Sequence, residues 1–341
     1  MSQSKVLIIY TGGTIGMIEN PETGVLEAFD FSHLDEQIPE LSRFEVELEA
    51  ISFETPIDSS DMCPKYWKEI AEIIFDNYSK YTGFVVLHGS DTMAYTASAL
   101  SFMLQGLKKP IILTGSQLPI GTIRTDGREN LITSIEIAAT TDKEGNSLIQ
   151  EVAIYFESFL YRGNRTTKIS AHAFDAFKSP NFPYLAHAGV SIEYNENAVY
   201  TSVFDNLHLN TKMEERVALI KIFPGFTASL YTSFFNAENV KAVVLETFGS
   251  GNAPNNKEFF KLIEDYINAG GIVINVTQCY TGSVDQGKYA NSTMFNFLGV
   301  ISAKDMTTEA AITKIMYLLG NSASVEAVKE DFVRNLTGEK K

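Results

Sequence analysis

The sequence predicts an α/β fold in two parts: a larger amino-terminal domain with a mostly parallel sheet, and a smaller carboxyl-terminal domain with its own parallel sheet. Short β-branched runs alternate with segments of helical period, which is the pattern of parallel α/β folds. The alternation lapses once into polar, asparagine-rich sequence and then resumes. A chain of 341 residues also exceeds what one ordinary hydrophobic core requires. We therefore expect domains at 1–193 and 214–341, joined by a connection at 194–213.

The elements are predicted from apolar runs and helical periodicity. In the first helix, Trp67, Ile70 and Ile74 fall on one face, and Pro64 suits the first turn. The helices expected in the first domain are 64–78, 91–107 and 126–140, between strands at 5–10, 83–87, 110–114 and 151–156. In the second domain we expect strands at 216–222, 240–246 and 271–276, and helices at 227–236, 256–268 and 305–319.

Composition excludes several classes of function. The net charge of −15 is spread along the chain, and such a surface repels nucleic acids and anionic membranes. No apolar run approaches the ~20 residues that span a bilayer. The first apolar run is of strand length, which argues against a signal peptide, and two cysteines do not suggest a secreted, disulfide-rich scaffold. We therefore expect a cytoplasmic protein that binds neither nucleic acid nor membrane.

Two glycine motifs follow predicted strands. The run Thr11-Gly12-Gly13-Thr14 permits a tight turn and leaves two hydroxyls at the end of the first strand. Its spacing is not that of a nucleotide-binding loop, so no cofactor is predicted. The second strand ends in His88-Gly89-Ser90-Asp91, which combines a hydroxyl with a carboxylate where free backbone amides point outward. Helix capping is the simpler interpretation of both motifs.

Further polar side chains follow other predicted strands. Lys168 has the chemistry to relay a proton from a hydroxyl held near it. The pair Ser59 and Ser60 suits recognition of an amino acid, although it also suits a helix cap. Ser116 follows another strand and offers a backbone amide to an oxyanion. The histidines are scattered, so we interpret His88 as structural and assign no metal.

The chain resembles the bacterial-type L-asparaginases, specifically the intracellular type I branch. The segments 11–16 and 87–96 are similar to the two signatures of that family, and the likeness extends through 161–168, 249–254 and 277–279. The resemblance implies hydrolysis of L-asparagine to aspartate and ammonia without a cofactor. It also implies a larger amino-terminal and a smaller carboxyl-terminal α/β domain, assembled as homodimers that often pair into homotetramers.

The resemblance also implies roles for individual residues. Thr14 would be the nucleophile and form a β-aspartyl ester. Ser90, Asp91 and Lys168 would form a second catalytic cluster, in which Lys168 polarises the Ser90 hydroxyl and Asp91 binds the substrate ammonium. The remaining substrate contacts would be Ser59 and Ser60 to the carboxylate, an amide near Ser116 to the oxyanion, and Asn252 from a partner subunit.

Two positions depart from the family pattern. Ser90 stands where the family usually has threonine, so the hydroxyl is kept but the methyl that restricts its rotamer is lost. The loop after the first motif lacks the tyrosine that many relatives have there. Another branch places this phenol after the Gln-Cys motif, where this chain has Tyr289. We predict that Tyr289 hydrogen-bonds Thr14; the alternative is that Tyr289 only packs between the domains.

Two other functions remain open at this stage. One is an ammonia-releasing subunit of a tRNA-dependent amidotransferase, although such proteins carry an extra domain before the glycine motif. The other is a sensor that binds an amino acid without catalysis, which the Ser90 replacement and the missing loop tyrosine keep open.

Overall fold

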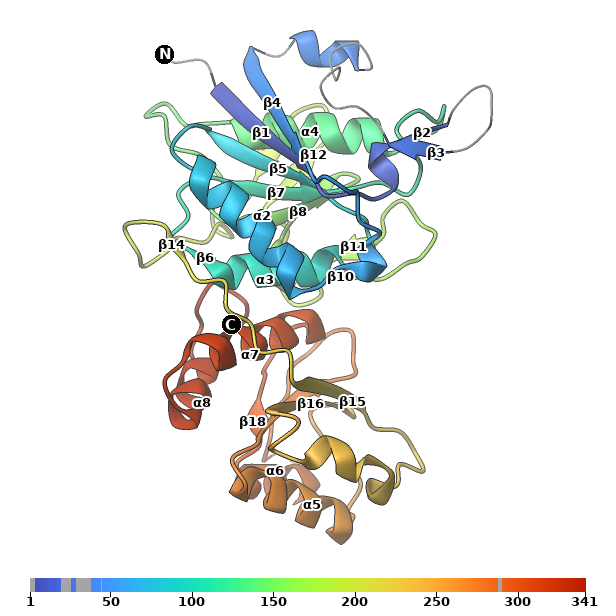
Figure 1. The fold of residues 1–341 in the computed structure, drawn as a ribbon, viewed down its shortest axis with the longest axis vertical. Helices are drawn as coiled ribbons and strands as arrows, with labels where there is room; N and C mark the ends of the chain where they lie inside the picture. Colours follow the sequence, from blue (N-terminus) through green and yellow to red (C-terminus); the bar gives the residue numbers. More distant parts are fainter. Residues whose placement is uncertain (1–3, 20–25, 29–37, 44, 288–289) are drawn as a thin grey trace. The chain divides into compact units, whose positions relative to one another are not determined.

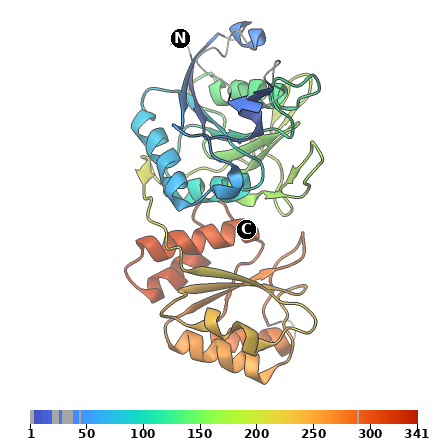
Figure 2. The same cartoon turned by 45° about the vertical axis from the view of Figure 1, so that its right-hand side comes forward.

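The computed structural model describes residues 4–19, 26–28, 38–43, 45–287 and 290–341. The chain divides into two compact units, Met1–Leu209 and Asn210–Lys341 (Figures 1 and 2). Each unit contains a largely parallel sheet with helices packed against it, so the predicted fold class is confirmed. The division falls inside the segment that was expected to connect two domains.

The first unit is built on an eight-stranded sheet. Five neighbouring strands are parallel, and three further strands extend one side in antiparallel fashion. In spatial order the strands are β13 (Ile192–Tyr194), β12 (Ala186–Ala188), β9 (Phe159–Arg162), β8 (Val152–Phe156), β7 (Ile111–Thr114), β5 (Gly83–Leu87), β1 (Ser4–Tyr10) and β4 (Val46–Ser52).

The order of the parallel strands creates a natural ligand-binding edge. Counted along the chain, the five parallel strands lie in the order second, first, third, fourth, fifth. The connections from β1 and β5 therefore lead to opposite sides. In open α/β sheets, ligands bind where this reversal occurs, at the carboxyl ends of the strands. Here that point lies between the ends of β1 and β5, where the two glycine motifs begin.

Helices cover both faces of this sheet (Figures 1 and 2). Val85 of β5 belongs to a buried cluster with Leu131 and Ile135 of α4 (Gly127–Ala139). The adjacent Phe84 points the other way and stacks on Tyr78, which follows α2 (Pro64–Asn77), with ring centroids 6.0 Å apart. Such alternation is the two-residue period of a strand that is buried on both sides.

Some expected elements have different bounds. The helix expected at 91–107 ends early, because α3 spans Met93–Met103 and the chain then forms β6 (Leu104–Gln105), paired with β14 (His208–Leu209). Gly106, with a φ of 87°, accompanies this change of direction. The segment expected as a helix at 227–236 forms the 3-10 helix η6 (Ala228–Phe235). Strand β4 was not predicted.

The second unit contains a four-stranded parallel sheet. Its strands lie in chain order: β15 (Val217–Lys221), β16 (Ala242–Thr247), β17 (Ile272–Thr277) and β18 (Ile301–Ser302). Its core is rich in aromatic side chains, and Phe259 contacts both Phe226 and Phe235. The helices are α5 (Lys257–Asn268), α6 (Ala290–Leu298), α7 (Thr308–Asn321) and α8 (Val325–Val333).

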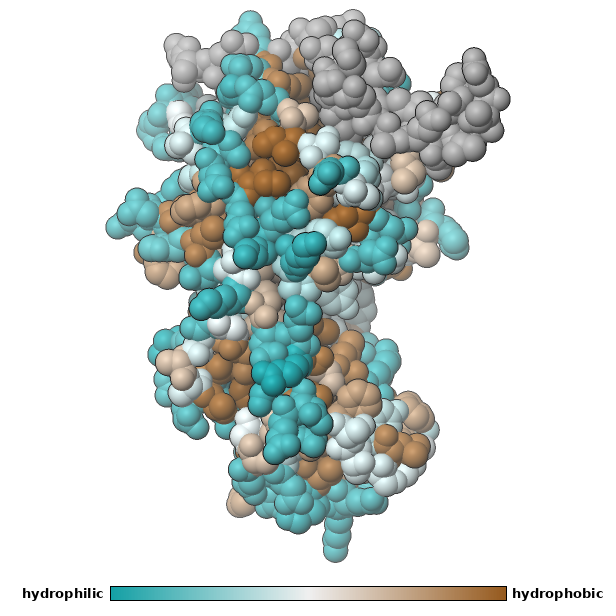
Figure 3. Space-filling view, in the orientation of Figure 1, coloured by the Kyte–Doolittle hydropathy of each residue, from teal (hydrophilic) through white to brown (hydrophobic). Residues whose placement is uncertain are grey.

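The face shown in Figure 3 is largely hydrophilic, with smaller hydrophobic areas between the polar residues. Within the described ranges, every helix is too short or too polar to cross a bilayer.

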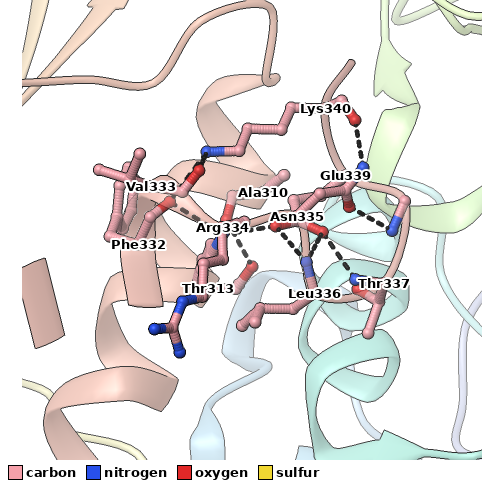
Figure 4. Close-up of polar contacts among 12 residues, drawn as sticks. Ala310, Thr313, Phe332, Val333, Arg334, Asn335, Leu336, Thr337, Glu339 and Lys340 are labelled. Carbon is pink, nitrogen blue, oxygen red and sulfur yellow. Dashed lines mark hydrogen bonds and ion pairs between the residues drawn. The ribbon is translucent and has the colours of Figure 1, made fainter. Parts of the chain in front are cut away.

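A buried ion pair fixes the end of the chain in the second unit. Lys314 of α7 is fully buried, and its Nζ lies 2.5 Å from Glu339 Oε1 and 3.0 Å from the Phe332 carbonyl oxygen. The Glu339 carboxylate also accepts hydrogen bonds from the backbone amides of Leu336 and Thr337 (Figure 4). Both charges therefore have partners despite their burial.

We predict that Glu339→Gln lowers the unfolding free energy by about 3–5 kcal/mol, because it leaves the Lys314 charge buried without its counter-ion. Urea unfolding of the full chain measures this loss. The matched control is Glu264→Gln, which removes a carboxylate 3.5 Å from the exposed Lys261. Such surface pairs contribute at most about 1 kcal/mol. Equal midpoints for the two variants would contradict a stabilising role for the buried pair.

Candidate active site

Three polar segments meet at the carboxyl edge of the first unit's sheet. They follow β1, β4 and β5, which are adjacent parallel strands. Backbone hydrogen bonds join them: the Thr11 amide donates to the Leu87 carbonyl at 3.1 Å, and the Ile57 amide donates to the Thr11 carbonyl at 2.8 Å. The segment after β7 joins the same edge, because the His88 amide donates to the Thr114 carbonyl at 2.9 Å.

The glycines of both motifs allow these segments to approach closely. A Cβ atom on Gly13 would lie 2.5 Å from the Gly89 amide nitrogen, and one on Gly12 would lie 2.1 Å from the Ile57 carbonyl oxygen. A Cβ on Gly89 would lie 2.6 Å from Ser59 Oγ. Gly12 and Gly13 also have φ angles of 134° and 90°, which favour glycine. Side chains at these positions would separate the segments.

Thr14 begins a short 3-10 turn, η1 (Thr14–Gly16), directly after this junction. The turn is fixed to the domain core, since the Tyr10 hydroxyl donates to the Gly16 carbonyl at 3.1 Å and Ile15 is fully buried. Thr14 itself is only half-buried. Its hydroxyl is thus held on a packed turn at the edge where ligands bind in such sheets.

Lys168, Ser90 and Asp91 form a hydrogen-bonded cluster beside this turn. Lys168 lies on β10 (Thr167–Lys168), and its Nζ donates to Ser90 Oγ at 2.8 Å and to Asp91 Oδ1 at 2.6 Å. The Lys168 side chain is 16% exposed, whereas that of Asp91 is 68% exposed. Because the Ser90 oxygen accepts from the ammonium, its own hydrogen must point away from Lys168. The cluster can therefore offer a proton and a carboxylate to a ligand.

The two serines after β4 differ in their surroundings. Both lie in the 3-10 turn η4 (Ser59–Asp61), which Asp58 caps. The Asp58 carboxylate accepts from the Ser60 amide at 2.8 Å and from the Ser60 hydroxyl at 2.9 Å, and these bonds hold the pKa of Asp58 below its usual range. Ser59 is buried against Gly89. The residue that caps this turn is therefore Asp58, which directly precedes the two serines.

Ser116 uses its hydroxyl within its own loop. Ser116 Oγ donates to the Leu118 carbonyl at 2.6 Å, and the Asp126 carboxylate accepts from the Gln117 and Leu118 amides. A Cβ on the preceding Gly115 would lie 2.3 Å from the His88 carbonyl oxygen, so this loop packs directly against the second motif. Any contribution of Ser116 to a ligand is therefore expected from its backbone.

His88 belongs to a buried hydrogen-bond chain. Trp67 Nε1 donates to Thr96 Oγ1 at 3.0 Å, the Thr96 oxygen lies 2.9 Å from His88 Nε2, and His88 Nδ1 lies 2.6 Å from the Gly89 carbonyl oxygen. The chain fits a neutral imidazole that accepts at Nε2 and donates at Nδ1. Complete burial lowers the pKa of His88 to about 4. His88 therefore supports the Gly89 backbone, which agrees with the structural role expected for it. The sequence did not indicate that Trp67 and Thr96 complete this hydrogen-bond chain.

Across the described residues, the His, Cys, Asp and Glu side chains form no group of three or more that could hold a metal ion. The first unit brings together Thr14, Ser59, Ser90, Asp91 and Lys168, with the Ser116 loop adjacent. The other two predicted site residues belong to the second unit.

Asn252 lies in a tight turn of the second unit, in which Phe248 and Asn252 exchange backbone hydrogen bonds. The buried Asn275 of β17 holds this turn, because its Nδ2 donates to the Gly251 carbonyl at 3.2 Å. Tyr289 lies outside the described residues, and so do residues 20–25 of the segment after the first motif. On either side of residues 20–25, β2 (Met17–Glu19) and β3 (Leu26–Ala28) pair in antiparallel fashion.

Both units match families of known proteins. Residues 5–200 match the model described as "Asparaginase, N-terminal", and residues 216–332 match "Glutaminase/Asparaginase C-terminal domain". The chain is 42% identical over 343 aligned residues to L-asparaginase 1 of Escherichia coli, covering 99% of this chain and 98% of that protein.

Solved structures agree with the sequence comparisons. L-asparaginase I from Vibrio cholerae superimposes with a TM-score of 0.90 at 39% identity, and all of both chains is covered. The thermostable L-asparaginase from Thermococcus kodakarensis gives a TM-score of 0.89 at 28% identity over 99% of each chain. Because family models match most of its length, this chain belongs to the asparaginase family, which confirms the resemblance found in its sequence.

Proposed function

We propose that this chain hydrolyses L-asparagine to L-aspartate and ammonia, with Thr14 as the nucleophile. The main support is the contact of Lys168 with both Ser90 and Asp91, next to the turn that bears Thr14. A nucleophile, a proton-relaying hydroxyl and a carboxylate thus share one edge of the sheet. The names of the E. coli and V. cholerae relatives support the choice of substrate.

In the proposed reaction the Thr14 oxygen attacks the side-chain amide carbon of asparagine. The C–N bond then breaks, the nitrogen takes a proton and leaves as ammonia, and an aspartyl ester remains on Thr14. Water attacks this ester, giving aspartate and restoring the Thr14 hydroxyl. Ser90, polarised by Lys168, supplies or accepts the proton at the nitrogen or the water.

The charged ends of the substrate have matching groups at the same edge. The exposed carboxylate of Asp91 suits the α-ammonium group. Ser59 suits the α-carboxylate through its hydroxyl. Ser60, whose amide and hydroxyl both donate to Asp58, would exchange that partner for the substrate carboxylate. Backbone amides near Ser90 and Ser116 suit the oxyanion that forms at the amide carbon.

We predict that Thr14→Val abolishes ammonia release, with a loss of at least about 10⁴-fold in kcat, because valine keeps the shape but removes the nucleophile. Ammonia is measured with asparagine, with glutamine, whose side chain is one methylene longer, and with D-asparagine, which has the opposite configuration. The matched control is Thr11→Val, whose hydroxyl only donates to the Leu87 carbonyl at 3.0 Å. Thr11→Val should lose stability but keep far more activity than Thr14→Val. If Thr14→Val turned over asparagine as fast as Thr11→Val, the proposed nucleophile would be ruled out.

We further propose that Tyr289 hydrogen-bonds Thr14 and helps to remove its proton. The expected result of Tyr289→Phe is a fall of about 10²-fold in kcat, because the phenolic hydroxyl then no longer assists proton transfer. Tyr280→Phe, at a half-exposed tyrosine of the same unit, is the matched control and should leave kcat unchanged. Unchanged turnover in Tyr289→Phe would mean that this tyrosine only packs.

The assembly is proposed to be a homodimer or homotetramer in which Asn252 completes the site of a partner subunit. Thr14→Val chains and Asn252→Ala chains, refolded together in equal amounts, should regain up to about a quarter of wild-type activity, because half of the dimers are mixed and each mixed dimer has one intact site out of two. Activity that stays at the level of the separate variants would indicate that each site uses its own Asn252.

The same family resemblance supports a cytoplasmic location, which cell fractionation can test.

A further inference from the structure

Thr92 occupies a helix-capping position but directs its hydroxyl elsewhere. It is the N-cap residue of α3, where threonine commonly accepts a hydrogen bond from the first turn. Within the described structure of α3 the Thr92 side chain makes no such bond. Its hydroxyl instead donates to the Ser59 carbonyl at 2.7 Å. By contrast, Thr307 at the N-cap of α7 does accept from the Ala310 amide, at 3.1 Å.

This bond joins two segments that contribute different functions to the site. Ser59 lies in the turn after β4 and is a proposed contact of the substrate carboxylate. Thr92 directly follows Ser90 and Asp91 in the segment after β5. Ser59 and Thr92 are 33 positions apart, and the chain between them includes all of α2 and β5, so local chain geometry does not fix their spacing.

The two segments are also in van der Waals contact, but this contact does not fix their relative orientation. Gly89 packs against Ser59 so tightly that a Cβ would lie 2.7 Å from the Ser59 Cβ. Such van der Waals contact limits approach but permits sliding, because it is individually weak and non-directional. The Thr92 hydrogen bond adds a directional constraint on the Ser59 backbone.

We propose that Thr92 is a positioning residue that sets the place of Ser59 relative to Ser90 and Asp91. Thr92 thereby acts on the capture of the substrate carboxylate and not on bond cleavage. The inference rests on the proposed function, because it takes Ser59 as a substrate contact.

The test compares Thr92→Val with Thr92→Ser in steady-state kinetics on asparagine with the full chain. Valine keeps the shape and removes the hydrogen bond, so KM should rise about five- to tenfold, as expected for one lost hydrogen bond of about 1 kcal/mol, with kcat changed less than about twofold. Serine keeps the hydroxyl and should hold KM within about threefold of wild type. Loss of this one hydrogen bond should lower the Tm of the valine variant by only a few degrees, so the deciding result is the rise in KM and its rescue by serine.

Thr307→Val is the matched control, because it removes a hydroxyl that does cap a helix. That variant should lower Tm and leave KM unchanged. An unchanged KM in Thr92→Val would overturn the positioning role, and so would a fall in kcat at constant KM. A Tm loss like that of Thr307→Val, with no rescue of KM by serine, would also overturn it, since Thr92 would then be structural.

Two further variants separate this inference from the proposed function. If Ser59→Ala raises KM while Thr92→Val does not, the positioning role fails and the proposed substrate contact stands. If Ser59→Ala leaves KM unchanged, the positioning role fails as well, because there is no substrate contact to position. Activity in Thr14→Val would reject the proposed nucleophile and would leave the KM comparison at Thr92 interpretable.

Discussion

The candidate site depends on the close approach of two backbones at the carboxyl edge of one sheet. Gly13 follows β1 and Gly89 follows β5, and there is no room for a Cβ atom between them. The adjacent parallel strands set this geometry, and the glycines make it sterically possible. Thr14 directly follows Gly13 and Ser90 directly follows Gly89, so the close approach of the two glycines brings these two backbone segments near one another.

Several side chains around this junction hold the backbone in place and are not proposed to take part in the reaction. Neutral His88 is held between Thr96 and the Gly89 carbonyl, and Asp126 fixes the loop that follows β7. Buried polar groups that are fully hydrogen-bonded in this way keep a backbone in one conformation. Their rigidity matters for a reaction in which misplacement of the reacting groups by 1 Å is costly. Most polar residues near the site therefore act by holding others in place.

The departures from the predicted elements have physical explanations. β4 is an edge strand in which Glu47 and Glu49 alternate with Leu48, and its short two-residue period was overlooked in an acidic segment. The helix expected at 91–107 is longer than the observed α3. The helix ends early because Leu104 pairs with Leu209, which is distant in the sequence. Local propensity carries no information about such pairing.

The sequence by itself determined the fold class, the main parallel strands and the two glycine motifs, since alternating periodicity and glycine placement are local properties of a chain. It also predicted that the proposed site residues of the first domain follow its strands. Only the tertiary structure decided which of these side chains have hydroxyls free for a ligand and which are committed elsewhere. Ser60 bonds Asp58, Ser116 bonds its own loop, and Thr92 leaves its helix uncapped to reach Ser59. The partner of a hydroxyl depends on what the fold brings within about 3 Å, and sequence spacing does not specify that distance.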